Sequence, residues 1–118
     1  MGVRCWKAAE NMGQEMATWV AACVADDVDK EDVIGFRHGD RDYAIYRTAE
    51  GDFFATDGHC THERTLLCDG LVIGHVIECP KHNGRFDIPT GKAIRAPVLR
   101  DIQTFPTKVE DGTVFVLV

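Results

Sequence analysis

The chain has 118 residues, of which 45% are hydrophobic, and this is enough for one domain with a modest core. Its formal net charge of −6 and isoelectric point near 5.2 argue against nucleic-acid binding, which requires a basic surface. No apolar run is long enough to cross a bilayer and nothing at the N-terminus reads as a signal peptide, so we expect a cytoplasmic protein without a membrane segment.

The first 17 residues carry no strong helical pattern, because Gly2, Asn11 and Gly13 interrupt it. We expect residues 1–17 to form a poorly ordered or peripheral extension, and residues 18–118 to form a single domain. The domain begins with a short apolar run at 19–24. A run of five acidic residues and one lysine follows at 26–32, and it is expected to be a solvated turn, with partner docking as the alternative.

Two strands are predicted next, at 33–37 and 41–48, because a Gly-Asp turn at residues 38–40 separates two runs rich in β-branched and aromatic residues. A second turn at 50–52 leads into a strand at 53–56. Near the C-terminus, strands at 102–109 and 113–118 flank a turn at 110–112. These segments predict an antiparallel sandwich or barrel that forms the base of an all-β fold.

Between these base strands lies a segment with a different pattern, at about residues 57–97. It contains a turn at 66–70, two short strands over 71–78 that bend at Gly74, and a strand at 85–88. We expect it to be an inserted subdomain, from which Ala96-Pro97-Val98 returns the chain to the base.

Two Cys/His pairs stand at either end of this segment. Cys60-Thr61-His62 is separated by sixteen residues from Cys79-Pro80-Lys81-His82. Thiolate and imidazole are the side chains that bind borderline-soft metals best. A Cys2His2 zinc site usually places both cysteines in one half and both histidines in the other. One of each per half is instead what a [2Fe–2S] cluster needs when one iron takes both thiolates and the other both imidazoles, which is the Rieske arrangement. A mononuclear zinc site, or two unrelated pairs in a packed core, remain the alternatives.

The chain resembles the small Rieske ferredoxins of bacterial Rieske oxygenase systems over roughly residues 18–118. Besides the two Cys/His motifs, the resemblance includes Tyr43-Ala44-Ile45-Tyr46, Asp69-Gly70 and Gly84-Arg85-Phe86-Asp87. The runs around the two motifs are most similar to ferredoxins of the rhizopine-catabolism type. The resemblance implies a Rieske fold, an antiparallel base with an inserted cluster-binding subdomain. It also implies a [2Fe–2S] cluster bound by four ligands: Cys60, His62, Cys79 and His82.

The function implied by the resemblance is one-electron transfer from a flavin-dependent ferredoxin reductase to a terminal oxygenase. The protein would be an electron carrier and not itself an enzyme, and a carrier that visits two partners is most simply a monomer. Its acidic character would suit a basic patch on a redox partner. The alternative from another class is a small regulatory or assembly subunit of a larger redox enzyme.

Three cysteines remain after the motif cysteines are assigned, namely Cys5, Cys23 and Cys68, and we expect them to be free thiols. High-potential relatives carry a serine and a tyrosine hydroxyl near the cluster, at the positions of Gly84 and Phe86 here. The absence of both hydroxyls predicts a potential at the low end of the Rieske range, on the order of −150 mV.

Overall fold

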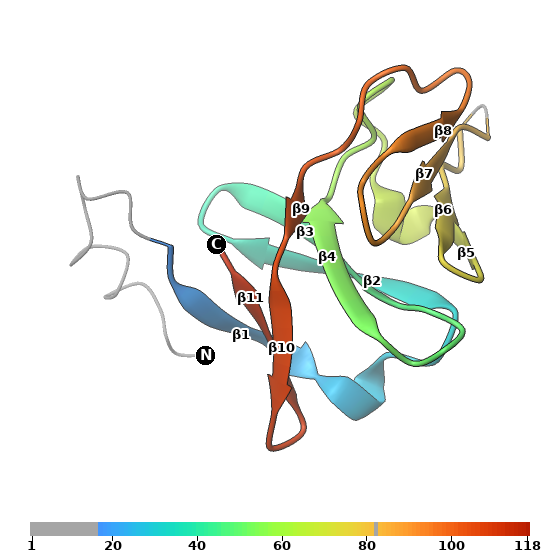
Figure 1. Cartoon of the computed structure of the whole chain (residues 1–118). Helices are drawn as coiled ribbons and strands as arrows, with labels where there is room; N and C mark the ends of the chain where they lie inside the picture. Colours follow the sequence, from blue (N-terminus) through green and yellow to red (C-terminus); the bar gives the residue numbers. More distant parts are fainter. Residues whose placement is uncertain (1–16, 82) are drawn as a thin grey trace.

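The computed structural model describes residues 17–81 and 83–118, and its regular elements are almost all antiparallel strands. Figure 1 shows a base built from two sheets and a third sheet inserted beside it, so the predicted all-β architecture is confirmed. Within the described residues, no helix is long and apolar enough to span a membrane. The expectation for residues 1–17 falls, except for Ala17, outside the described part of the chain.

The first base sheet joins the two ends of the described chain, in the order β1-β11-β10. Thr18 and Val118 exchange backbone hydrogen bonds of 2.9 Å in both directions, which fixes the register of the terminal strands. The start of the acidic run, Asp26 and Asp27, lies in a single turn of 3-10 helix, η1, and its end, Asp32, begins β2. The elements of this part are β1 (Trp19–Val24), η1 (Ala25–Asp27), β10 (Thr107–Glu110) and β11 (Thr113–Leu117).

The second base sheet has the order β2-β3-β4-β9 and contains the predicted hairpin. Its strands are β2 (Asp32–His38), β3 (Arg41–Arg47), β4 (Phe53–Asp57) and β9 (Thr104–Phe105). The expected single strand at 102–109 is wrong, because Pro106 splits it into β9 and β10. A proline has no N–H to donate to a sheet, and here it marks the point at which the chain changes sheets.

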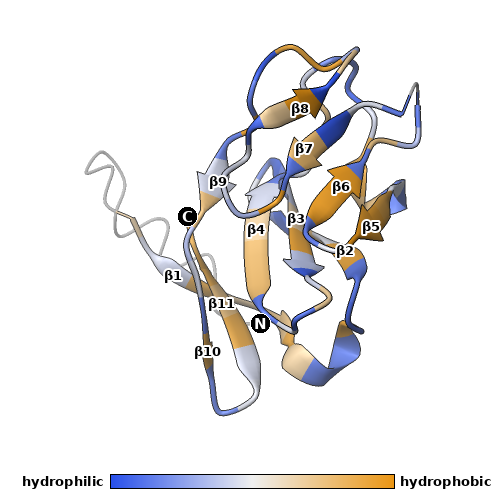
Figure 2. Ribbon diagram, turned by 45° about the vertical axis from the view of Figure 1, so that its right-hand side comes forward, coloured by the Kyte–Doolittle hydropathy of each residue, from blue (hydrophilic) through white to orange (hydrophobic). Residues whose placement is uncertain are grey.

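The inserted sheet has the order β5-β6-β7-β8 and lies between β4 and β9 in the sequence. The turn expected before it is the 3-10 helix η2, and β8 is a strand that the sequence analysis did not predict. Figure 2 shows β5 and β6 hydrophobic along most of their length. The elements are η2 (Leu67–Asp69), β5 (Leu71–Ile73), β6 (Val76–Glu78), β7 (Arg85–Asp87) and β8 (Ala93–Arg95).

Strand β3 is buried on both faces, because it separates two hydrophobic cores. Ile45 points into the core between the two base sheets, with Ala55, Val114 and Val116. Ala44 and Tyr46, one residue to either side, point into the core between the base and the inserted sheet. Successive side chains of a strand point to opposite faces, so four buried residues in a row require a covered sheet on each side. The second core contains Cys60 and Cys79 and therefore connects the fold to the candidate site.

Candidate functional site

Two loops of matching construction carry the predicted ligands. In the first, the backbone N–H of Cys60 donates to the carbonyl of Thr65 at 2.9 Å; in the second, Cys79 donates to Gly84 at 2.8 Å. An antiparallel pair closes each loop one residue further out, His59 with Leu66 and Glu78 with Arg85. The repeated geometry gives both cysteines the same place, at the first position of a six-residue loop, residues 60–65 and 79–84.

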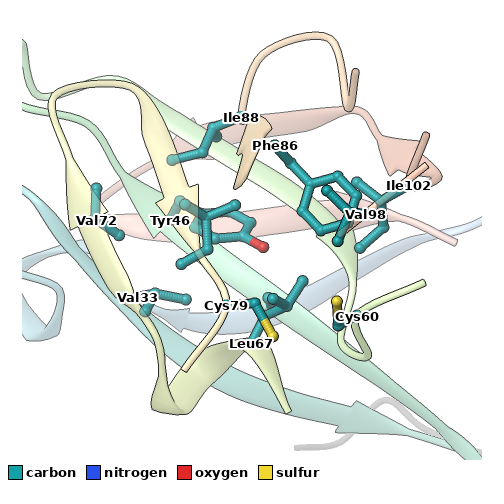
Figure 3. Packing of buried hydrophobic residues seen from close by; sticks show 12 residues of the cluster. Val33, Tyr46, Cys60, Leu67, Val72, Cys79, Phe86, Ile88, Val98 and Ile102 are labelled. Atoms are coloured by element: carbon teal, nitrogen blue, oxygen red, sulfur yellow. The ribbon is translucent and has the colours of Figure 1, made fainter. Parts of the chain in front are cut away.

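The two cysteines lie against each other at one end of the second core. Cys60 is 4% exposed and Cys79 is 1% exposed, and the Cys60 side chain lies close enough to Cys79 to raise the pKa of its thiol. Figure 3 shows both sulfur atoms at the same end of this core, on the side of Phe86 and Val98. The fold thus brings together two of the four predicted ligands from segments nineteen positions apart in the sequence.

The environment of the thiols favours a bound cation. Burial raises the pKa of the Cys79 thiol to about 11, the backbone N–H of Lys81 opposes this shift, and the nearby Cys60 side chain adds to it. A thiolate in such surroundings is costly unless a metal ion supplies the compensating charge, and a coordinated thiol is deprotonated outright. The donor set therefore fits a metal centre that draws two thiolates from an apolar pocket.

The structure describes one of the two predicted histidine ligands. His62 is exposed on the first loop, two positions after the buried Cys60. His82 lies outside the described residues. Among the described residues, no three His, Cys, Asp or Glu side chains converge on one metal position. A binuclear cluster takes only two protein ligands per iron, so it does not require three donors around one point.

Side chains on both loops hold them in register. Lys81 on the second loop forms an ion pair of 3.2 Å with Glu63 on the first. At the base of the second loop, Glu78 accepts from the Nε of Arg85 at 3.0 Å and from the amide of Asn83 at 2.6 Å. These hydrogen bonds lower the pKa of Glu78, the larger effect coming from Arg85. Asn83 has a positive φ of 60°, a conformation that asparagine tolerates better than most residues.

A third segment, residues 96–100, lies against both loops, and sequence reasoning missed its role. A Cβ atom placed on Gly84 would come within 2.7 Å of a Val98 methyl group, so this segment packs closely on the second loop. Two residues later, the Arg100 carbonyl accepts a hydrogen bond of 2.8 Å from the Thr61 hydroxyl of the first loop. Leu99, between these contacts, is 85% exposed. The only sequence signal was an apolar run, Pro97-Val98-Leu99, between two arginines.

The remaining cysteines and histidines are not part of the two six-residue loops. Cys23 and Cys68 are free thiols, as expected, and Cys5 lies outside the described residues. Cys68 packs against Gly35, because a Cβ atom placed on Gly35 would lie 3.2 Å from the Cys68 sulfur. His59 lies 3.6 Å from Asp42, and His75 lies 3.4 Å from Asp87.

Comparison with known proteins agrees with this geometry. The family model described as the Rieske [2Fe-2S] domain matches residues 18–106. The ferredoxin component of the naphthalene 1,2-dioxygenase/salicylate 5-hydroxylase systems of a Ralstonia species is 43% identical over 93 residues, which cover 79% of this chain and 88% of that protein.

Two solved structures share the fold at similar coverage. The ferredoxin of Sphingomonas yanoikuyae B1 aligns with a TM-score of 0.79 and 35% identity, over 85% of this chain and 98% of that one. A chain from the complex of reduced oxygenase and oxidized ferredoxin in carbazole 1,9a-dioxygenase aligns with a TM-score of 0.78 and 34% identity, over 84% and 92%. The cofactor indicated by these matches is a Rieske-type [2Fe–2S] cluster.

Proposed function

Because this chain belongs to the Rieske [2Fe–2S] domain family, we propose that it takes single electrons from a flavin-dependent ferredoxin reductase and delivers them to a terminal oxygenase. Similar proteins are named as ferredoxin components of oxygenase systems, and such components carry electrons and are not catalysts. The observation that carries the proposal is the pair of buried, adjacent thiols presented by two loops of matching construction.

We assign the ligands by residue chemistry. Cys60 and Cys79 would bind one iron as thiolates, and His62 and His82 would bind the other as neutral imidazoles. The cluster supplies a site that gains and loses one electron. Imidazoles bring less negative charge than thiolates, and this raises the potential above that of four-cysteine clusters. The buried cysteines and the exposed His62 favour electron exchange with a partner protein at the histidine side of the site, because that side faces the solvent.

We propose the unit at about residues 57–97 as the cluster-binding subdomain within a domain of 18–118. The three segments that border the site support this assignment, since the two loops and residues 96–100 belong to it or adjoin it. Residues 1–17 are assigned as an N-terminal extension. The carrier is proposed to act in the cytoplasm as a monomer that visits each partner in turn.

The partner assignment draws on a relative of the same shape. One structure that shares the fold is a complex of reduced oxygenase and oxidized ferredoxin, which supports an oxygenase as the acceptor for this chain. The finer resemblance to ferredoxins of rhizopine catabolism rests only on the runs around the two Cys/His motifs. The relatives found by comparison serve naphthalene, dinitrotoluene, cumate and other dioxygenase systems.

Anaerobic purification followed by iron, sulfide and zinc analysis tests the cofactor and its ligands. We expect equal iron and inorganic sulfide, a red-brown colour, and a paramagnetic signal after one-electron reduction. Variants His62→Cys and His82→Cys keep a metal ligand but replace imidazole with thiolate, and each should lower the potential. A colourless protein with one zinc would contradict the assignment, as would a potential that neither variant changes.

Reconstitution tests the place of the carrier in a pathway. The holoprotein is mixed with NADH, a purified flavin-dependent reductase and a purified terminal oxygenase, and product formation is measured with and without it. We expect turnover to depend on the carrier and to saturate with its concentration. An intact, reducible cluster that supports no turnover with any oxygenase tested would favour the alternative of a regulatory or assembly subunit.

A further inference from the structure

Charge is divided unequally between the two parts of this molecule. Residues 60–100 contain six Lys or Arg and four Asp or Glu, a net charge of +2. Residues 17–59 together with 101–118 contain five Lys or Arg and thirteen Asp or Glu, a net charge of −8. The acidic character of the whole chain therefore comes from the base, while the part that carries the paired loops is positive.

Two of the four acidic groups of the 60–100 region form ion pairs with a lysine or an arginine of the same region. Glu63 pairs with Lys81 at 3.2 Å, and Glu78 pairs with Arg85 at 2.8 Å. Asp87 accepts hydrogen bonds from both the backbone and the hydroxyl of Thr90. These ion pairs involve Lys81 and Arg85, and the other lysines and arginines of this region are not part of them.

Three arginines remain on the segments that border the site. Arg64 is in the first loop, Arg95 ends β8, and Arg100 donates to the Thr61 carbonyl at 3.4 Å. All three are exposed, and within the described chain no carboxylate lies within ion-pair distance of any of them. Among the base acids, Asp42 pairs with Arg37 and Asp57 pairs with Arg41, and Asp101, which directly follows Arg100, accepts a hydrogen bond of 2.9 Å from the backbone N–H of Ala93.

Exposed apolar residues occur on the same segments of the chain as these arginines. Leu99 is 85% exposed, Ile94 is 51% exposed and Leu66 is 38% exposed. Leu66 follows the first loop, Ile94 precedes Arg95, and Leu99 precedes Arg100. Exposed apolar residues together with arginine are typical of protein interfaces, where arginine is enriched relative to lysine. We call the six residues Arg64, Leu66, Ile94, Arg95, Leu99 and Arg100 the arginine face.

We propose that the arginine face is the docking surface of this carrier and that it fits an acidic surface on the partner protein. The inference rests on the proposed electron-transfer function. It differs from the expectation drawn from net charge, which favoured a basic partner surface. At physiological ionic strength, charges are screened beyond about 8 Å, so the charges beside the site govern final docking more than the total charge does.

Small oxidants of opposite charge test the sign of the field at this face. The reduced holoprotein is mixed in a stopped-flow instrument with ferricyanide, an anion, or with hexaammineruthenium(III), a cation. Each accepts one electron from the reduced cluster. We expect the ferricyanide rate constant to fall at least about twofold from low to physiological ionic strength, because added salt screens an attraction. The ruthenium rate constant should not fall.

Two matched double variants localise the effect. Arg64→Glu with Arg95→Glu should make the ferricyanide rate rise with salt, whereas Lys30→Glu with Lys108→Glu, on the base, should leave its fall intact. Both variants change the net charge equally. An unchanged visible spectrum shows that the cluster is intact. The milder pair Arg64→Gln with Arg95→Gln replaces the first if it does not fold, and it should flatten the salt dependence.

An acidic polypeptide tests docking itself. Poly-L-glutamate should bind the arginine face and slow oxidation by ferricyanide in the wild type and in the Lys30/Lys108 variant, but not in the Arg64/Arg95 variant. A wild-type ferricyanide rate that rises with salt, or the same salt dependence in both double variants, would overturn the docking inference. A cluster that is still reduced and oxidised reversibly would leave the proposed carrier function supported. A protein that takes up no electron from dithionite contradicts the carrier function instead.

Discussion

Tyr46 is the largest fully buried side chain, and its hydroxyl has a single defined role. Thr56 donates its hydroxyl proton to the Asp57 carbonyl at 2.8 Å, so Tyr46 must donate in the 2.8 Å contact between Tyr46 and Thr56. Burial raises the pKa of Tyr46 well above its ordinary value near 10, and the hydrogen bond with Thr56 opposes that shift.

We predict that Tyr46→Phe lowers the free energy of unfolding by about 0.5–1.5 kcal/mol at pH 8, because one buried hydrogen bond is lost. The difference in unfolding free energy between the wild type and the variant should narrow above pH 10. There Tyr46 ionises in the unfolded wild type but not in the folded one, so the wild type loses stability as pH rises while the variant lacks this group. Denaturant unfolding at pH 8 and 10.5 measures both values; a gap that widens with pH would contradict the assignment.

Gly84 shows how a residue at the site is limited by its neighbour. A hydroxyl here should raise the potential by donating to the cluster, but a Cβ would meet a Val98 methyl group at 2.7 Å. We predict that Gly84→Ser alone costs about 1–3 kcal/mol through overpacking. Adding Val98→Ala should recover much of that loss, as thermal unfolding would show.

The double variant Gly84→Ser with Val98→Ala isolates the hydroxyl when it is compared with Gly84→Ala with Val98→Ala. Both place a Cβ at position 84, and only the first adds a hydroxyl that can donate. Protein-film voltammetry should give a higher midpoint potential for the serine variant. Equal potentials would show that a donor at this position does not tune the cluster, and the low potential expected from Gly84 would then need another cause.

At the scale of elements, the turn from β7 to β8 is fixed by a close crossing of two chain segments. The carbonyl of Gly91 accepts from the backbone N–H of Ile102 at 2.8 Å, and a Cβ on Gly91 would overlap the Ile102 carbonyl oxygen. Gly91 has a φ of +77°, and Gly39 in the β2–β3 turn has a φ of +63° with open space around it. The two glycines differ mainly in crowding.

We predict that Gly91→Ala destabilises the fold by more than Gly39→Ala does. Both alanines pay about 1–2 kcal/mol for a left-handed conformation, and only the first also clashes with backbone. The difference in unfolding free energy between the two variants measures the crowding. Equal losses would mean that the segment at 102 moves away at little cost, and that the crossing does not hold β8 in place.

At the scale of the whole molecule, the two cores and the cluster depend on one another. Cys60 and Cys79 belong to the core that joins the inserted sheet to the base, so a cofactor bound by both would also link the two loops that leave this core. A group that binds only the folded state stabilises it.

We predict that removing iron with a chelator lowers the melting temperature, by about 4–8 °C for each kcal/mol of stability lost in a domain near this size. The inserted sheet should lose amide protection first, because its loops lose their common anchor. Calorimetry and hydrogen exchange on the holo and iron-depleted forms measure this. Cys23→Ala, which alters a thiol in β1, should leave the difference between the two forms unchanged.

The sequence alone was sufficient for the fold class, and it also supplied the four proposed ligand residues. Alternation of apolar and polar residues and the glycine turns are local properties, so the hairpins at β2–β3 and β5–β6 could be predicted from single segments. The spacing of the two Cys/His motifs likewise reflects the ligand needs of one cofactor. Strand β8 and the break at Pro106 were not predicted, because short strands form only where partner strands pair with them.

Only the tertiary structure decided which residues surround the site and where charge lies. The contacts of Val98 with Gly84 and of Arg100 with Thr61 join positions far apart in the sequence, and no local pattern encodes such neighbours. Net charge is a sum over all residues, and it concealed a positive region beside an acidic base. Ligand chemistry is carried by residue type and spacing, whereas packing and electrostatic fields depend on distance in space, which the chain acquires only on folding.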